Sequence, residues 1–239
     1  DFCLSRGLGD VYKRQLQIPQ GQYVILLGAN GSGKSTLLNV LAGTLSPERG
    51  KGEIFIHEQN VTHQAVHKRS AYLGRIFQQP SDGVASDLSV LENFRLAALR
   101  TSSKGLKVGT GKAFRDEVAS RVEVLNMSLE NRLDRPIGSF SGGQRQALSL
   151  LMATYVKPQL LLLDEPTAAL DPKSAETVFS LACQIIKHQQ LTAVLVTHDL
   201  RHCTRAGDRI IQLSEGKIIR DEVGASRESL SLSDIQGWF

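Results

Sequence analysis

Residues 28–35 carry the sequence feature that most limits how this chain can fold. They read Gly-Ala-Asn-Gly-Ser-Gly-Lys-Ser, which fits the phosphate-loop pattern GxxxxGK[ST]. The apolar run Tyr23 to Leu27 predicts a strand before them, and a helical pattern from Ser35 to Gly43 follows. A Gly-rich turn of matching sequence is the alternative interpretation. The strand, loop and helix together predict an α/β fold whose loop amides face a bound phosphate.

Apolar runs alternate with helical patterns along the rest of the chain, which predicts a parallel sheet with helices on both faces. Further strands are expected at 52–57, 73–77, 160–163 and 193–197, and a long helix at 172–188. Leucine and valine recur at helical spacing between Leu88 and Leu133, with a loop at 101–111. We therefore expect one main domain at 16–220 with a helical subdomain inserted at about 81–140. A tail follows at 221–239, ending in a short amphipathic helix that packs on the core.

The first 15 residues do not fit this plan. They carry glycines and scattered charges without the alternation that a first strand would show. Residues 1–15 are therefore expected to be either a leader foreign to the protein or an ordinary chain terminus.

Composition narrows the class of protein. The 239 residues are 41% hydrophobic, enough for one packed core, and no apolar window is long enough for a transmembrane helix or resembles a secretory signal. The three cysteines lie far apart, which favours reduced thiols over a disulfide or metal framework. A net charge of +4 without a long basic run argues against nucleic acid as the partner. These features predict a cytoplasmic protein.

Two carboxylates follow the buried strand at 160–163. Because parallel sheets bind ligands at the carboxyl ends of their strands, Asp164 and Glu165 are expected beside the phosphate loop. Asp164 and the Ser35 hydroxyl suit Mg²⁺, Lys34 suits the β- and γ-phosphates, and Glu165 suits the activation of an attacking water. A strand end that simply meets solvent is the alternative when the two acids are read without the loop.

The run Phe140-Ser141-Gly142-Gly143-Gln144 resembles the signature motif of the ABC ATPases, and the order of motifs resembles that family from about Leu16 to Ile219. The resemblance implies a P-loop NTPase fold with a mostly parallel central sheet, an antiparallel β portion and an inserted helical subdomain. It also implies a head-to-tail dimer, in which the signature of one subunit clamps the γ-phosphate of ATP held by the other.

Three further residues each resemble a functional position of the family. Gln78 resembles the glutamine that senses Mg²⁺ and the attacking water, although Gln79 is adjacent; Asp171 resembles the residue that communicates across the dimer and also fits a helix N-cap. His198 resembles the histidine that contacts the γ-phosphate, its alternative being a helix-start histidine without a ligand. The remaining histidines fit no motif and are interpreted as surface or packing residues. The family's adenine-stacking aromatic has no clear counterpart, since Phe2 and Tyr12 are the only aromatic residues before the strand at 23–27 and neither has the expected spacing.

The resemblance implies an ATP hydrolase that powers transport of a small solute, most simply import, with Mg²⁺ as cofactor. An exporter subunit and a non-transport ABC ATPase acting on DNA or ribosomes are the alternatives. Expected partners are a second copy, integral membrane permease subunits and an extracytoplasmic solute-binding protein, without nucleic acid; the expected place is the inner face of the plasma membrane. The expected catalytic residues are Glu165, His198 and Gln78; the metal ligands Ser35, Gln78 and Asp164; and the nucleotide-binding residues Gly28, Asn30, Gly31, Ser32, Gly33, Lys34, Ser35, Thr36, Ser141, Gly142, Gly143, Gln144 and Asp171.

Overall fold

A six-stranded sheet forms the centre of the molecule. The computed structural model describes residues 2–5, 16–48, 52–101 and 109–239, with only the backbone described for 2–5. The sheet runs in the order β10-β9-β3-β8-β7-β6, and all neighbouring pairs are parallel except β9 with β10. Its strands are β3 (Tyr23–Leu27), β6 (Leu73–Ile76), β7 (Leu160–Asp164), β8 (Ala193–Val196), β9 (Arg209–Ser214) and β10 (Lys217–Val223). The predicted parallel sheet is confirmed.

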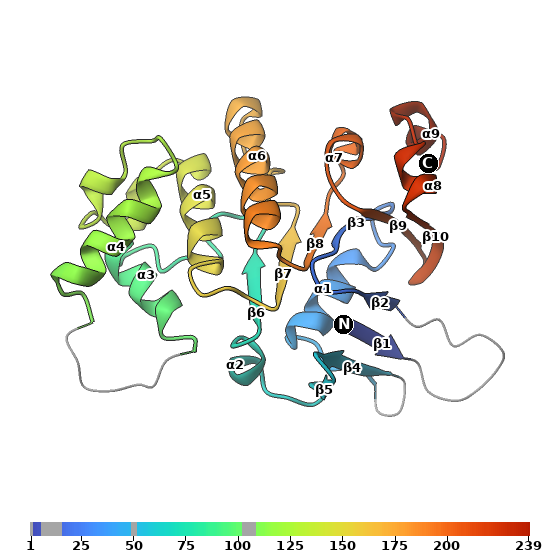
Figure 1. The fold of residues 1–239 in the computed structure, drawn as a ribbon, viewed down its shortest axis with the longest axis horizontal. Helices are drawn as coiled ribbons and strands as arrows, with labels where there is room; N and C mark the ends of the chain where they lie inside the picture. Colours follow the sequence, from blue (N-terminus) through green and yellow to red (C-terminus); the bar gives the residue numbers. More distant parts are fainter. Residues whose placement is uncertain (1, 6–15, 49–51, 102–108) are drawn as a thin grey trace.

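A second, antiparallel sheet lies beside the first and has the order β2-β1-β4-β5 (Figure 1). Its strands are β1 (Phe2–Ser5), β2 (Leu16–Ile18), β4 (Glu53–Ile56) and β5 (Gln59–Asn60). The antiparallel portion implied by the resemblance is therefore present.

Strand β1 corrects one prediction. Phe2–Ser5 pairs with both β2 and β4, so the expectation that residues 1–15 contain no strand is wrong for these four residues. The pairing partners, which lie 11 or more residues away in sequence, supply the order that the local pattern does not predict. Residues 6–15, including Tyr12, lie outside the described part, and the foreign origin of the leader stays a prediction.

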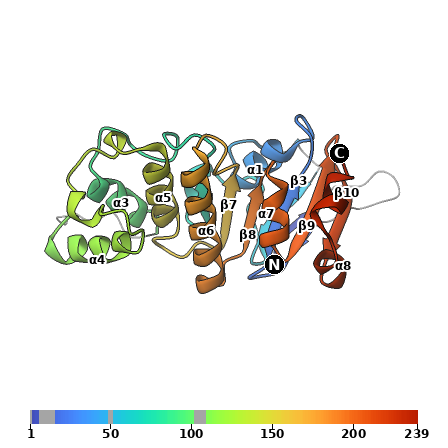
Figure 2. The same cartoon turned by 90° about the horizontal axis from the view of Figure 1, so that it is seen from above.

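Helices cover both faces of the main sheet and extend beyond one of its edges (Figures 1 and 2). Helix α1 packs on one face, and α5 and α6 pack on the other. Among the helices of the described residues, none combines the length and hydrophobicity needed to cross a bilayer. The helices are α1 (Lys34–Ala42), α2 (Val66–Arg69), α3 (Val90–Ala98), α4 (Lys112–Glu123), α5 (Gly142–Ala153), α6 (Pro172–Gln189), α7 (Leu200–Arg205), α8 (Ala225–Glu228) and α9 (Leu232–Gln236), with 3₁₀ turns at η1 (Glu130–Arg132) and η2 (Ile137–Ser139).

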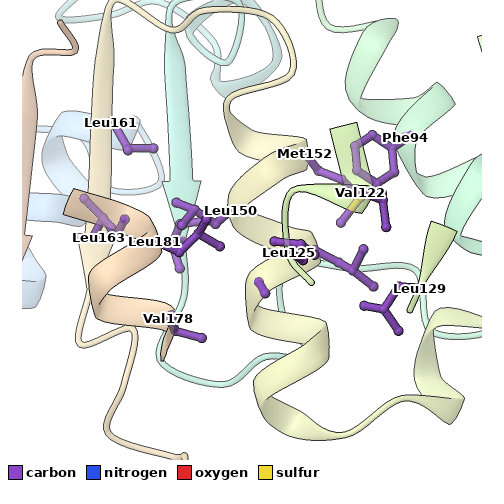
Figure 3. Packing of buried hydrophobic residues seen from close by; sticks show 14 of the residues in the cluster. Phe94, Val122, Leu125, Leu129, Leu150, Met152, Leu161, Leu163, Val178 and Leu181 are labelled. Atoms are coloured by element: carbon purple, nitrogen blue, oxygen red, sulfur yellow. The ribbon is translucent and has the colours of Figure 1, made fainter. Parts of the chain in front are cut away.

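The hydrophobic core is divided by the sheet. Alternate residues of β7 point to opposite sides: Leu161 and Leu163 meet α5 and α6, whereas Leu160 and Leu162 meet the α1 side. The first of these clusters continues without a break into α3 and α4, as the labelled side chains of Figure 3 show. Helix α5 therefore joins the outer helices to the sheet.

The C-terminal tail packs on the sheet as expected. The Ile235 side chain of α9 is fully buried in a small cluster with Ile25 and Leu27 of β3, and Trp238 packs against this cluster. The hairpin of β9 and β10, which leads into the tail, turns at Glu215 and Gly216.

Candidate active site

The loop between β3 and α1 has the curled backbone that its glycines predict. Gly31 has a φ of 78° and Gly33 a φ of 102°, both in the left-handed region. The buried Lys34 side chain crosses back over the loop, where its Nζ donates to the carbonyl oxygens of Gly28 and Ala29 at 2.7 and 3.0 Å. Burial lowers the Lys34 pKa, and the negative charges of Glu165 and Asp164 oppose this change. The loop is thus closed around its lysine.

One side of the loop packs against the protein, and the other side is exposed to solvent. A side chain at Gly28 would overlap the Leu213 carbonyl oxygen and the Ser32 side chain, and the Gly216 amide donates to the Ser32 carbonyl at 2.9 Å. Asn30 and Gly31, by contrast, are exposed, and a side chain at Gly31 would meet nothing within 4 Å. An exposed Gly-rich loop directly before a helix suits an anion such as a phosphate group. Ser35 and Thr36 are exposed in the first turn of α1.

Asp164 ends β7 close to the start of α1. Burial raises the Asp164 pKa, while the charges of Arg75 and Lys34 and a hydrogen bond with Ser35 oppose this rise. The Arg75 guanidinium on β6 lies 3.7 Å from the carboxylate and donates to the Asn39 amide oxygen of α1 at 2.8 Å. A carboxylate and a hydroxyl side by side are the oxygen donors that Mg²⁺ prefers, so the residues present fit this ion.

Glu165 and His198 meet beyond the ends of neighbouring strands. The His198 Nε2 lies 2.8 Å from the Glu165 Oε1, although one residue follows β7 and the other follows β8. Glu165 has a φ of 46°, which is strained for a residue with a side chain and is typical of functional sites. Both residues line a hollow of about 340 Å³, together with Thr167, Ala168 and Asp199. Glu165 is thus held by a histidine at the edge of an open space.

The predicted signature residues lie at the start of α5. Ser141 is the N-cap, its hydroxyl accepts from the Gln144 amide at 3.3 Å, and the Gln144 side chain accepts from the Ser141 amide at 3.1 Å. Gly142 and Gly143 form the first turn, whose amides point out of the helix. This helix start therefore has the form of a second anion site.

Helix α6 begins next to the signature. A side chain at Gly143 would overlap the Ser174 side chain, so α5 and α6 approach closely at their N-termini. Asp171 caps α6 by accepting from the Ser174 amide at 3.1 Å, and hydrogen bonding to Ser174 lowers its pKa. The predicted N-cap role of Asp171 is confirmed. Gln78 and the adjacent Gln79 are both exposed just after β6, and exposure does not distinguish them.

The structure adds residues that sequence reasoning missed. Arg75 contacts Asp164, and Gln146 of α5 reaches the segments around Phe77 and Pro166. The sequence could have indicated both residues, because Arg75 stands in an otherwise apolar strand and Gln146 on the buried face of a helix, where polar side chains need a partner. Of the histidines interpreted as packing residues, His202 is buried and stacks on the Phe179 ring at 3.8 Å between centroids.

Known proteins are similar to this chain in sequence and in fold. The family model described as ABC transporter matches residues 12–168. A tyrosine transport ATP-binding protein of Clostridioides difficile (strain R20291) is 36% identical over 92% of this chain and 86% of its own length. A sulfate/thiosulfate import ATP-binding protein of Synechocystis (strain PCC 6803) is 36% identical over 89% of this chain, which spans only 56% of that protein.

Solved structures agree with the sequence relatives. The dimeric ATP-binding cassette MJ0796, in a post-hydrolysis state bound to ADP and Pi, superposes with a TM-score of 0.76 at 27% identity, covering 93% of this chain and 98% of that one. The loop after β3, the acids at the end of β7 and the signature at the start of α5 thus lie in the fold that such cassettes have. This chain belongs to the ABC transporter family, as an ATP-hydrolysing nucleotide-binding subunit.

Proposed function

We propose that this chain works as a head-to-tail dimer that hydrolyses MgATP and drives import of a small solute through membrane permease subunits. The observation that carries the proposal is the contact of 2.8 Å between Glu165 and His198, beside the phosphate loop. It pairs a candidate base with the group that orients it, at the place where the γ-phosphate of a bound ATP would end.

In the proposed reaction the loop amides and Lys34 bind the β- and γ-phosphates, and Glu165 takes a proton from the water that attacks the γ-phosphate. His198 fixes the Glu165 carboxylate and contacts the γ-phosphate. Ser35, Asp164 and Gln78 would hold Mg²⁺, which when bound would neutralise charge on the phosphates. Because Arg75 lies against Asp164, this carboxylate is already oriented before any ion arrives.

The dimer is proposed because the chain has two kinds of anion site. The signature turn, Ser141 to Gln144, would complete the site of a second copy, and Asp171 would lie in the same interface. MJ0796 is described as dimeric in its state bound to ADP and Pi. In this scheme residues 16–220 form the ATPase domain, in which about 81–140 transmit motion to the permease, and 221–239 form the tail. We place the subunit on the inner face of the plasma membrane.

Import is favoured over export because one of the relatives carries the name sulfate/thiosulfate import protein. An extracytoplasmic solute-binding protein is then a further partner. In proteoliposomes that contain the subunit with its permease, movement of solute toward the compartment that holds the ATPase supports import. Movement in the opposite direction supports the exporter alternative.

ATP hydrolysis measured across protein concentrations tests the motor. We expect the rate per subunit to rise with concentration, because each site needs a partner. Glu165→Gln should bind ATP and dimerise, with turnover lowered at least about 100-fold, as for loss of a general base. Glu117→Gln on α4, which makes the same change at an exposed ion pair, should match the wild type. Full activity in a strict monomer contradicts the proposal.

A further inference from the structure

Gln146 ties together two segments that the proposed mechanism uses. Its side chain is fully buried on α5, five residues after Ser141. Its amide nitrogen donates to the Phe77 carbonyl and to the Pro166 carbonyl, both at 2.9 Å. Phe77 directly precedes Gln78, and Pro166 directly follows Glu165. A single primary amide, with its two N–H groups in one plane, thus fixes the backbone beside both residues.

The same helix carries the signature at its start. Five residues of α-helix span about 7.5 Å, so the Ser141 turn and the Gln146 amide lie on one short rigid rod. In the proposed dimer the Ser141 end would contact ATP in the partner's site, whereas the Gln146 end contacts the loops of its own site. A shift of α5 at the Ser141 turn must therefore also displace the Gln146 amide.

The face of α5 that carries Gln146 is not fully hydrogen-bonded. The Gln146 Oε1 and the Ser149 Oγ, three residues later on the same face, are both buried without a hydrogen-bond partner among the described residues. Ser149 lies against the segment after Gln78, since a side chain at Gly83 would meet its Oγ at 3.5 Å. Buried polar atoms left unpaired are costly and favour an alternative arrangement that pairs them. These unpaired atoms therefore favour a movement of α5 relative to the 77–83 segment.

We propose that Gln146 is a positioning residue that couples the two ATP sites of the dimer. Clamping of the partner's ATP by the signature turn moves α5, and the Gln146 amide carries that movement to Gln78 and Glu165 of its own site. This inference rests on the proposed function, because it needs a dimer with two composite sites.

Gln146→Met tests the coupling, since methionine fills a similar volume without the two donors. We expect nearly unchanged ATP affinity and, when combined with Glu165→Gln, nearly unchanged dimerisation by ATP. We expect kcat to fall about ten- to a hundredfold, as for a displaced catalytic group. The Hill coefficient for ATP, above 1 in the wild type, should fall to about 1.

Asn93→Leu is the matched control. Asn93 is also buried, and its amide also holds backbone groups, at Ala85, Leu88 and Ser89 instead of beside the catalytic residues. Its loss should lower the melting temperature while kcat and the Hill coefficient stay within about twofold of the wild type. If the methionine variant does not fold, Gln146→Asn keeps the amide but withdraws it by one methylene, and the same changes are expected.

The inference is overturned by a wild-type kcat and Hill coefficient in the Gln146 variants, and also by equal losses in Asn93→Leu. A wild-type Hill coefficient of about 1 in an active dimer overturns the coupling alone. A wild-type chain that neither dimerises nor hydrolyses ATP overturns the proposed function as well, and this is measured without any Gln146 variant.

Discussion

Replacing Arg69 should destabilise the protein without touching the nucleotide site. Its side chain is 1% exposed, and its two terminal nitrogens donate to four carbonyl oxygens at 2.5–3.1 Å. Two of these oxygens belong to Val40 and Leu41 in the last turn of helix α1. The other two belong to Val61 and Thr62, directly after β5. Arg69 therefore fastens the helix behind the phosphate loop to the antiparallel sheet.

The cost of Arg69→Met follows from what each carbonyl retains. The Val40 and Val61 oxygens keep second donors, the amides of Gly43 and Gln64, so the loss falls mainly on the other two. A buried acceptor left without its partner costs about 1–3 kcal/mol, and the value lies at the low end here because the arginine also pays for its own burial. We expect about 3 kcal/mol in total, or a fall of about 6–12 °C in melting temperature for a chain of this size.

Thermal unfolding followed by circular dichroism measures this difference. Lys68→Met is the matched control, because it removes one positive charge from the same helix, α2, at an exposed position. A melting temperature for Arg69→Met within about 2 °C of this control would refute the reasoning, since buried carbonyls would then be satisfied without the guanidinium.

Two further outcomes are expected. Gly28→Ala should leave ATP binding too weak to detect by calorimetry, since the new methyl group would overlap the Leu213 carbonyl and push the loop away from its contact with β9. A wild-type affinity for ATP would contradict the described loop geometry. His202→Gln should reduce the loss of stability in acid. Burial lowers the His202 pKa, so the unfolded chain binds the proton more readily and native stability falls as pH drops below about 6.5. Urea unfolding at pH 7.5 and 5.5 checks the sign, and an equal loss in both proteins would show that another group is responsible.

Much of the fold could be predicted because local patterns and long-range order agree. The apolar run at Tyr23 to Leu27 specifies a strand, and the acids after Leu163 mark the end of another. The Asp-Pro pair at 171–172 marks the start of a helix. The predicted phosphate loop and the acids are brought together because β3 and β7 run parallel in one sheet, with only β8 between them.

The remaining features depend on pairing that no local pattern records. The four residues of β1 are ordered by β2 and β4, on either side of them. The His198–Glu165 contact and the two bonds of Gln146 join segments 20 to 69 residues apart. Tyr12 lies outside the described residues and only the backbone of Phe2 is described, so the adenine platform stays a prediction.

The position of β3 also determines when the nucleotide site can form during synthesis. This strand leads into the phosphate loop, yet its two neighbours are β8 and β9, and the loop itself rests on Gly216. At 5–20 residues per second, the ribosome adds the hairpin that supports the loop roughly 10–40 s after the loop itself. A nascent chain therefore carries the phosphate-loop sequence long before it can hold a nucleotide, and the site forms only once the rest of the sheet is available.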